Sequence, residues 1–123
     1  MSGTGSFFHH HLDHIARATR YSLKGLRAAW SETAFRQETL VLLVITPVAL
    51  IIGASGAERA LLIGSWLLVM IVECLNCGIE TIVDRVSTER HALSGQAKDV
   101  GSAAVFLSVL TAMAVWALVL FTP

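Results

Sequence analysis

The segment Leu67–Glu80, with the sequence LLVMIVECLNCGIE, decides the fold because it places polar groups inside a run that is otherwise apolar. Those polar groups are the side chains of Glu73, Asn76 and Glu80. On an α-helix, Glu80 lies about 20° and Asn76 about 60° around the axis from Glu73. One stripe of the helix therefore carries two carboxylates and an amide. A charge near the centre of a bilayer costs roughly 2.5–3.5 kcal/mol on insertion scales, so such a stripe indicates a functional site.

The composition of the whole chain is that of a membrane protein. Of its 123 residues, 54% are hydrophobic and 15% are charged, whereas a soluble domain carries about 25% charged residues. Nine Lys and Arg residues balance nine Asp and Glu residues, so net charge does not favour a nucleic-acid partner. The two cysteines, Cys74 and Cys77, lie in the apolar segment. Their position predicts buried packing residues and no disulfide framework.

Three apolar segments are each long enough to cross a bilayer, at about residues 39–57, 60–84 and 100–121. We therefore predict an all-α membrane protein in which residues 1–123 form one domain. Cations are concentrated before the first span and between the second and third. By the positive-inside rule, the N-terminus and the loop at 85–99 face the cytoplasm. These cations are Arg17, Arg20, Lys24, Arg27, Arg36, Arg85, Arg90 and Lys98.

Residues 14–37 are expected to form an amphipathic helix that lies in the membrane interface, because a basic face adjoins an apolar face rich in Leu and Trp. Two interpretations of its cations stay open: they attach the chain to anionic lipid, or they hold a phosphorylated ligand. Upstream lie His9, His10, His11 and His14. A polar N-terminus with incidental histidines is favoured there over a transition-metal site at His10 and His14.

The two carboxylates of the stripe are expected to differ in role because they differ in depth. Seven residues separate Glu73 from Glu80 by about 10 Å along a helix axis, which disfavours joint chelation of one ion. Glu80 lies near the predicted cytoplasmic end, where a phosphate-bound Mg²⁺ takes one or two protein carboxylates. Glu73 lies deeper, where a lipid hydroxyl would need a general base.

The chain has no Gly-x-x-x-x-Gly-Lys-Ser/Thr loop and no protein-kinase signature. On the interpretation that the cations hold a phosphorylated ligand, its phosphate groups would be bound by Lys98, by cations of the interfacial helix, and by backbone N–H groups where the third span begins.

Several sequence blocks occur together from Tyr21 onward. They are Tyr21–Trp30, Ala34–Glu38, the motif Glu73-x-x-Asn76-x-x-x-Glu80, Val83–Arg85 and Leu93–Ala104. In this order and spacing the chain resembles the small bacterial integral-membrane diacylglycerol kinases.

The resemblance implies a homotrimer of three-span subunits in the bacterial inner membrane. It implies MgATP-dependent phosphorylation of diacylglycerol to phosphatidate at the cytoplasmic face. By the same resemblance, Glu73 is the proton acceptor for the lipid hydroxyl and Asn76 supports the catalytic glutamates. Glu32 and Glu80 are implied as the Mg²⁺ ligands.

The remaining site residues also follow from the resemblance. The implied nucleotide contacts are Tyr21, Glu32, Glu80, Glu89, Arg90, His91, Lys98 and Asp99. The implied lipid site comprises Arg27, Ala28, Ala29, Trp30, Ala34, Phe35, Arg36, Gln37, Glu38, Glu73 and Ser102. The chain departs from the family pattern at His14, where a basic residue is common, and at Trp30–Glu32, which is one residue shorter. The interval from Glu32 to Phe35 and Glu38 is kept.

Two alternatives remain open at this stage. Undecaprenol kinases share the Glu-x-x-Asn-x-x-x-Glu core, although the match around Ala34–Glu38 and Leu93–Ala104 favours diacylglycerol. A proton-coupled transporter could use Glu73 as its proton carrier. A transporter would have no need of Glu32, Glu80 and Lys98 at the cytoplasmic interface.

Overall fold

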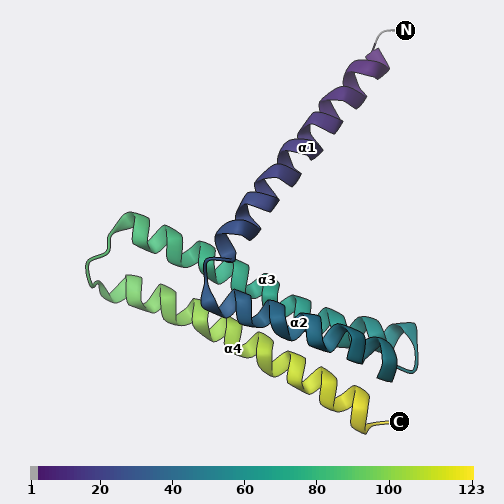
Figure 1. Cartoon of the computed structure of the whole chain (residues 1–123). Helices are drawn as coiled ribbons and strands as arrows, with labels where there is room; N and C mark the ends of the chain where they lie inside the picture. The colour runs from purple at the N-terminus through teal and green to yellow at the C-terminus, as the bar shows by residue number, and fades with distance from the viewer. Residues whose placement is uncertain (1–2) are drawn as a thin grey trace.

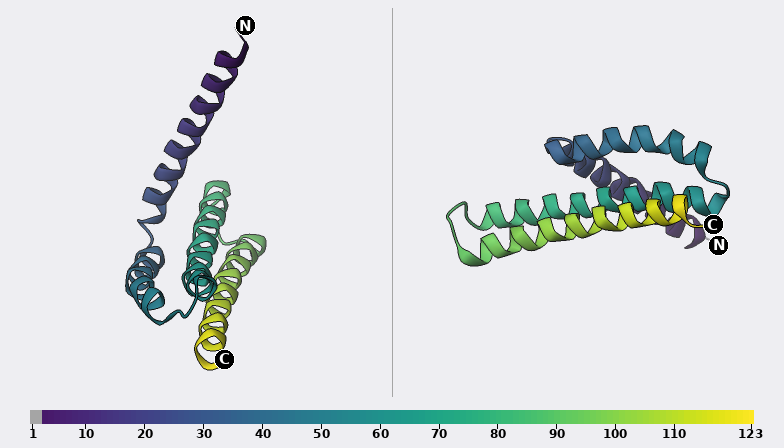
Figure 2. Two further views of the ribbon diagram at one scale, coloured as in Figure 1. Left: turned by 90° about the vertical axis from the view of Figure 1, so that its right-hand side faces the viewer. Right: turned by 90° about the horizontal axis from the view of Figure 1, so that it is seen from below.

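The computed structural model describes residues 3–123, and every regular element within them is an α-helix. The helices are α1 (Gly3–Ala29), α2 (Thr33–Ile52), α3 (Gly56–Val86) and α4 (Ala92–Phe121). Helices α2, α3 and α4 lie side by side, while α1 projects away from them (Figures 1 and 2). The expected all-α architecture is confirmed, and α2, α3 and α4 are each long and apolar enough to cross a membrane.

Helix α3 is the central element, because it packs against each of the other three helices. Its partner α4 runs antiparallel beside it, and α2 covers its first half (Figure 2). The residues of α3 that face inward recur every three or four positions, as one face of a helix requires. They are Leu62, Ser65, Val69, Glu73 and Asn76.

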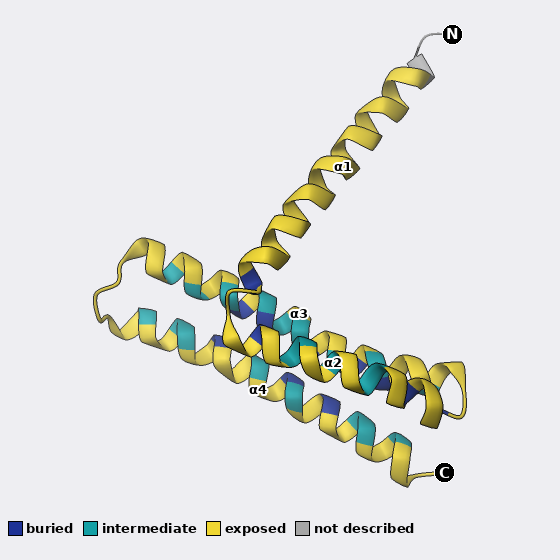
Figure 3. Cartoon of the chain, viewed as in Figure 1, coloured by how far each residue is buried: buried dark blue, intermediate teal, exposed yellow. Residues whose placement is uncertain are grey.

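The outer faces of these helices are apolar and exposed, as Figure 3 shows for most of α2 and α4. Examples are Leu43 on α2, Leu75 on α3 and Phe106 on α4, each more than 60% exposed. Apolar surface of this extent suits contact with lipid, because lipid tails are as apolar as these side chains. The same figure shows α1 exposed along nearly its whole length.

The helices are longer than the expected spans, and the first boundary differs from the expectation. Residues 14–37 do not form one helix, because α1 ends at Ala29 and α2 begins at Thr33. Backbone N–H groups of Ser31 and Glu32 donate to carbonyls three residues earlier, which tightens the end of α1. Arg36 then donates from its guanidinium to the carbonyls of Trp30, at 3.1 Å, and Ser31, at 3.3 Å. These bonds hold the turn at residues 30–32.

The link from α2 to α3 is closed by a cap. The Ser55 hydroxyl accepts from the backbone N–H of Glu58, and the Glu58 carboxylate accepts from the backbone N–H of Ala54. This reciprocal arrangement is a variant of the capping box and supplies partners to N–H groups at the start of a helix. Arg59 also donates to the carbonyl of Gly53 at 3.1 Å. The short connection between the two spans is thereby fixed.

Two indole groups tie the bundle together. Trp66 on α3 donates from Nε1 to the carbonyl of Glu38 on α2 at 2.9 Å. Trp116 on α4 donates to the carbonyl of Leu62 on α3 at 3.0 Å. Each bond joins two helices inside an apolar environment, where a donor without a partner is costly. The two bonds therefore help to set the register of α2 and α4 on α3.

Replacing either indole by a phenyl ring is expected to weaken the bundle. Trp66→Phe and Trp116→Phe each remove a donor and keep most of the ring, so the free energy of unfolding should fall by about 1 kcal/mol. Unfolding in mixed micelles with increasing SDS, followed by circular dichroism, measures the change. Trp30→Phe is the control, because the Trp30 indole donates no hydrogen bond within residues 3–123. Equal unfolding midpoints for all three variants would contradict this account.

Candidate active site

Glu73 and Asn76 lie at the centre of the site, on the face of α3 that the other helices cover. Their side chains are 6% and 8% exposed. The amide of Asn76 donates from Nδ2 to Glu80 Oε1 at 3.3 Å. Glu73 and Asn76 of the predicted polar stripe are therefore enclosed within the bundle, whereas Glu80 is partly exposed. The three residues occupy consecutive turns of one helix. Asn76 orients the Glu80 carboxylate directly.

The close approach of α4 encloses Asn76. Gly101 is buried, and a Cβ placed on it would lie 3.3 Å from Asn76 Cγ and collide with Asn76 Oδ1. Asn76 Oδ1 is itself buried and accepts no hydrogen bond within the described residues. A buried acceptor without a partner is uncommon in proteins and indicates a position where a ligand or water donates. The contact with Asn76 places Gly101 next to the site.

Glu32 reaches the same region from the turn between α1 and α2. It is the N-cap residue of α2, in an extended conformation, and its side chain makes no capping hydrogen bond. Its carboxylate is exposed and so remains available to a cation. Glu32 and Glu80 both lie within electrostatic range of Glu73 in the same chain. The structure therefore gathers three of the predicted acidic residues around one stretch of α3.

A cavity of about 550 Å³ lies between the end of α1 and the part of α3 that carries Cys74 and Cys77. Two of the residues expected at the lipid site, Ala28 and Ala29, line this cavity. Glu32, which was expected to bind Mg²⁺, lines it from the turn. Most of the other side chains around it are small. The complete lining is Ser22, Gly25, Leu26, Ala28, Ala29, Ser31, Glu32, Cys74, Cys77, Gly78 and Thr81. A molecule bound here would lie against the face of α3 that carries Cys77, next to Glu73.

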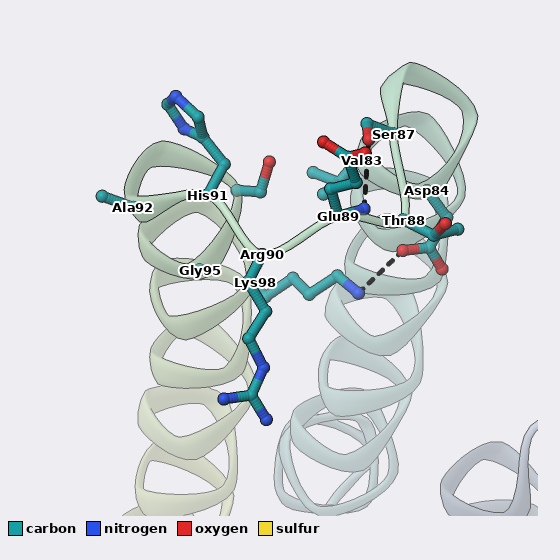
Figure 4. A pocket seen from close by; sticks show the side chains of 11 residues that line it. Val83, Asp84, Ser87, Thr88, Glu89, Arg90, His91, Ala92, Gly95 and Lys98 are labelled. Carbon is teal, nitrogen blue, oxygen red and sulfur yellow. Dashed lines mark hydrogen bonds and ion pairs between the residues drawn. The ribbon is translucent and has the colours of Figure 1, made fainter.

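A second cavity, of about 440 Å³, lies where α3 and α4 meet (Figure 4). Four of the residues expected to contact a nucleotide line it, namely Glu89, Arg90, His91 and Lys98. The Lys98 ammonium is 2.8 Å from Asp84 Oδ1 across the two helices. Asp84 was not assigned a role from the sequence, although its position one turn beyond Glu80 places it beside the acidic stripe.

His91 has a structural role at this cavity. Its Nδ1 accepts from the backbone N–H of Leu93, so it caps the start of α4. In Figure 4 its ring lies on the α4 side of the loop, apart from the Lys98–Asp84 pair. A capping side chain holds the first turn of the helix in place. Ala92, Ser94 and Gly95 of that turn line the cavity.

Several predicted residues lie outside both cavities. Tyr21 is 67% exposed on α1, and Asp99 and Ser102 are exposed on α4. Among the residues expected at the lipid site, Arg27, Trp30, Ala34 and Gln37 are exposed as well.

The remaining members of the predicted lipid site contribute to the α1–α2 turn and to α2. Arg36 clamps the turn through the carbonyl groups of Trp30 and Ser31. Phe35 is buried at 5% exposure. Glu38 is half-buried, and its Oε2 is buried without a partner in the described part of the chain. Glu38 lies within electrostatic range of Glu73, so α2 adds a further carboxylate to this region.

No three His, Cys, Asp or Glu side chains within residues 3–123 are arranged to hold a metal ion by themselves. Glu32 and Glu80 offer hard carboxylate oxygens from two different elements. This donor set fits Mg²⁺ that arrives on a nucleotide, since such an ion takes one or two protein carboxylates and is otherwise bound by phosphate and water.

Comparison with known proteins places this site in context. The family model described as prokaryotic diacylglycerol kinase matches residues 20–120. A diacylglycerol kinase of Pseudomonas aeruginosa is 51% identical over 110 residues, which cover 89% of each chain. The diacylglycerol kinase of Escherichia coli K12 is 49% identical over 109 residues, covering 88% of this chain and 89% of that protein. That of Haemophilus influenzae is 47% identical over 111 residues, covering 89% and 94%.

Adding a methyl group at Gly101 is expected to disturb the site through Asn76. Gly101→Ala should lower the free energy of unfolding by about 1–3 kcal/mol, because the added group overpacks a buried contact. Gly64→Ala is the control, since a Cβ there meets nothing within 4 Å; replacing Gly by Ala in a helix should stabilise it slightly. SDS unfolding of each variant measures both effects.

A double variant tests the cause of this loss. Asn76→Ala removes the group that the new methyl would strike, so Gly101→Ala should cost much less in the Asn76→Ala background. An equal cost of Gly101→Ala in the two backgrounds would show that the destabilisation arises elsewhere.

Proposed function

The chain belongs to the prokaryotic diacylglycerol kinase family, and we propose that Glu73 accepts the proton of the diacylglycerol hydroxyl as that oxygen attacks the γ-phosphate of ATP. The observation that carries this proposal is the position of Glu73. It is a buried carboxylate within electrostatic range of Glu32 and Glu80. It lies behind a cavity that opens between α1 and α3. A general base must lie where the hydroxyl arrives and where water is scarce.

The cavity beside Glu73 offers a place for the glycerol end of the lipid. The 550 Å³ cavity is lined by the last turns of α1, which carry Ala28 and Ala29, and by the middle of α3. An amphipathic helix that lies in the membrane interface would keep this cavity at the level of lipid headgroups. The small lining residues Gly25 and Gly78 leave room, since a Cβ on either would meet no atom within 4 Å. The glycerol end of a diacylglycerol would then lie against the wall behind which Glu73 is buried.

The nucleotide would bind at the cytoplasmic end of the same helix pair. About 20 residues of α3 suffice to cross the hydrocarbon, whereas α3 is 31 residues long. We propose that the extra residues lie at its C-terminal end, so that Val86 and the start of α4 would extend beyond the hydrocarbon by about 15 Å. Arg90 and Lys98 supply cationic groups to the 440 Å³ cavity there. With the N-terminal helix and this loop rich in cations, we propose that both face the cytoplasm of a bacterial inner membrane.

Glu32 and Glu80 would hold a phosphate-bound Mg²⁺ between the two cavities. Bound there, the ion supplies neutralisation of the charge that develops on the transferred phosphoryl group. The chain's own residues prepare this position: Asn76 orients Glu80, and Arg36 clamps the turn that presents Glu32. Asp84 holds Lys98 at the start of the nucleotide cavity. We propose that the functional particle is a homotrimer, as the resemblance implies.

The reaction requires one proton transfer and one phosphoryl transfer. Glu73 takes the hydroxyl proton as the bond from the lipid oxygen to the γ-phosphorus forms. The bond from that phosphorus to the β,γ-bridging oxygen breaks. ADP leaves with the electron pair of this bond on its β-phosphate oxygen. Lys98 and Arg90, which line the 440 Å³ cavity, would stabilise the phosphate oxygens of the nucleotide. The products are phosphatidate and ADP.

Phosphorylation of a defined lipid by purified protein tests this function. In mixed micelles with MgATP, diacylglycerol should be converted to phosphatidate, and Glu73→Gln should lower kcat by about 100-fold or more because the base is lost. Asp13→Asn, a change of carboxylate on the distant part of α1, should leave the rate unchanged. Labelled product resolved by chromatography gives the rates.

A parallel reaction with undecaprenol distinguishes the substrate. Phosphorylation of undecaprenol in preference to diacylglycerol would reassign the lipid. Failure to phosphorylate either lipid, or full activity of Glu73→Gln, would contradict the proposed function.

A further inference from the structure

The buried carboxylate of Glu73 has one hydrogen-bond donor within residues 3–123, and that donor is a thiol. Cys77 Sγ lies 3.9 Å from Glu73 Oε1, one helical turn further along α3. Both cysteines of the chain are free thiols. In an apolar environment a carboxylate without donors is costly, so even a weak donor has influence over its orientation. The Cys77 thiol therefore contacts Oε1 of Glu73 and not Oε2.

The same thiol forms part of the cavity wall. Cys77 lines the 550 Å³ cavity together with Gly78 and Cys74, whereas Glu73 does not line it. Cys77 is half-exposed and Glu73 is buried. The thiol thus stands between the space where the lipid headgroup would bind and the carboxylate that would take its proton. Its contact with Oε1 leaves Oε2 without a donor from the described residues.

We propose that Cys77 is a positioning residue for Glu73: its S–H holds Oε1 and thereby directs Oε2 to the lipid hydroxyl. This inference rests on the proposed role of Glu73 as the base. A general base works only when the accepting atom is within hydrogen-bond reach of the proton, so a fixed rotamer raises the fraction of productive encounters. The thiol takes no part in the transfer itself.

Cys74 provides an internal comparison. It lies on the same helix, lines the same cavity and has similar intermediate exposure. Its thiol, however, makes no hydrogen bond to Glu73 in the described structure. If small apolar volume were all that the cavity required of its cysteines, truncating either one should have the same effect. If the bond to Glu73 matters, truncating Cys77 should lower kcat more than truncating Cys74 does.

Steady-state kinetics of four variants in the full chain tests this proposal. Cys77→Ala should lower kcat with diacylglycerol about three- to tenfold, while the KM for MgATP stays within about twofold of the wild type. Cys77→Ser supplies a hydroxyl donor at the same position and should restore kcat to near the wild-type value. Cys74→Ala shortens the same cavity wall without removing a bond to Glu73, so any effect should fall on the lipid KM and its kcat should fall less than that of Cys77→Ala. Glu73→Gln is run alongside and should be inactive, with SDS unfolding as the check that each variant is folded.

The outcomes separate this proposal from the proposed function. Equal kcat for Cys77→Ala and Cys74→Ala would overturn the positioning role, as would a Cys77→Ser variant as impaired as Cys77→Ala. A rise in the lipid KM alone, with kcat retained, would overturn it too, since it would make Cys77 only part of the cavity wall. Activity retained by Glu73→Gln would instead contradict the assignment of the base.

Discussion

The enclosure of one polar stripe by apolar helices is the constraint on which the rest of this structure depends. Glu73 and Asn76 lie on a helix long enough to cross a membrane, and neither could face lipid without a large cost in free energy. Helix α4 packs against Asn76, and the first turns of α2 bring Glu38 within electrostatic range of Glu73. The indole bonds of Trp66 and Trp116 join α2 and α4 to α3. Gly101 brings α4 so close that a single methyl group would strike Asn76. The contacts that pack the helices together therefore also build the site.

The turn at residues 30–32 connects the exposed helix α1 to the region of this buried stripe. It ends the exposed helix α1, starts α2 and presents Glu32 with its carboxylate unused by any cap. Arg36 holds the turn through two carbonyl groups. Under the proposed function, this geometry lets a headgroup approach from the interface while a nucleotide approaches from the α3–α4 loop. The two substrates then meet along α3, with Glu73 on the lipid side and Glu80 on the nucleotide side.

The sequence predicted the helical class and the three spans because apolar length is a direct signal of a membrane helix. It also predicted that Glu73, Asn76 and Glu80 share one face, since helical periodicity alone decides that. The break after Ala29 was not predicted. Trp30-Ser31-Glu32 contains neither Gly nor Pro, and the turn depends on Arg36 reaching back to carbonyl groups five and six residues away.

Contacts between helices could not be predicted from the sequence, for a different reason. The pair Asp84–Lys98 joins residues 14 positions apart, and Gly101 meets Asn76 only because α3 and α4 pack in one register. No local pattern encodes that register. The contact of Cys77 with Glu73 is different, because a spacing of four residues on one helix could have indicated it. The apolar surroundings of the two cysteines suggested packing instead.

The central claim is that Glu73 and Glu80, on one helix, serve two different substrates. Equilibrium binding of MgATP to the purified protein in micelles, measured by titration calorimetry, tests it most directly. We predict that Glu73→Gln binds MgATP with wild-type affinity although it transfers no phosphate, and that Glu80→Gln binds MgATP at least tenfold more weakly. A Glu73→Gln variant that loses MgATP binding, or a Glu80→Gln variant that keeps it, would contradict the division of roles along α3.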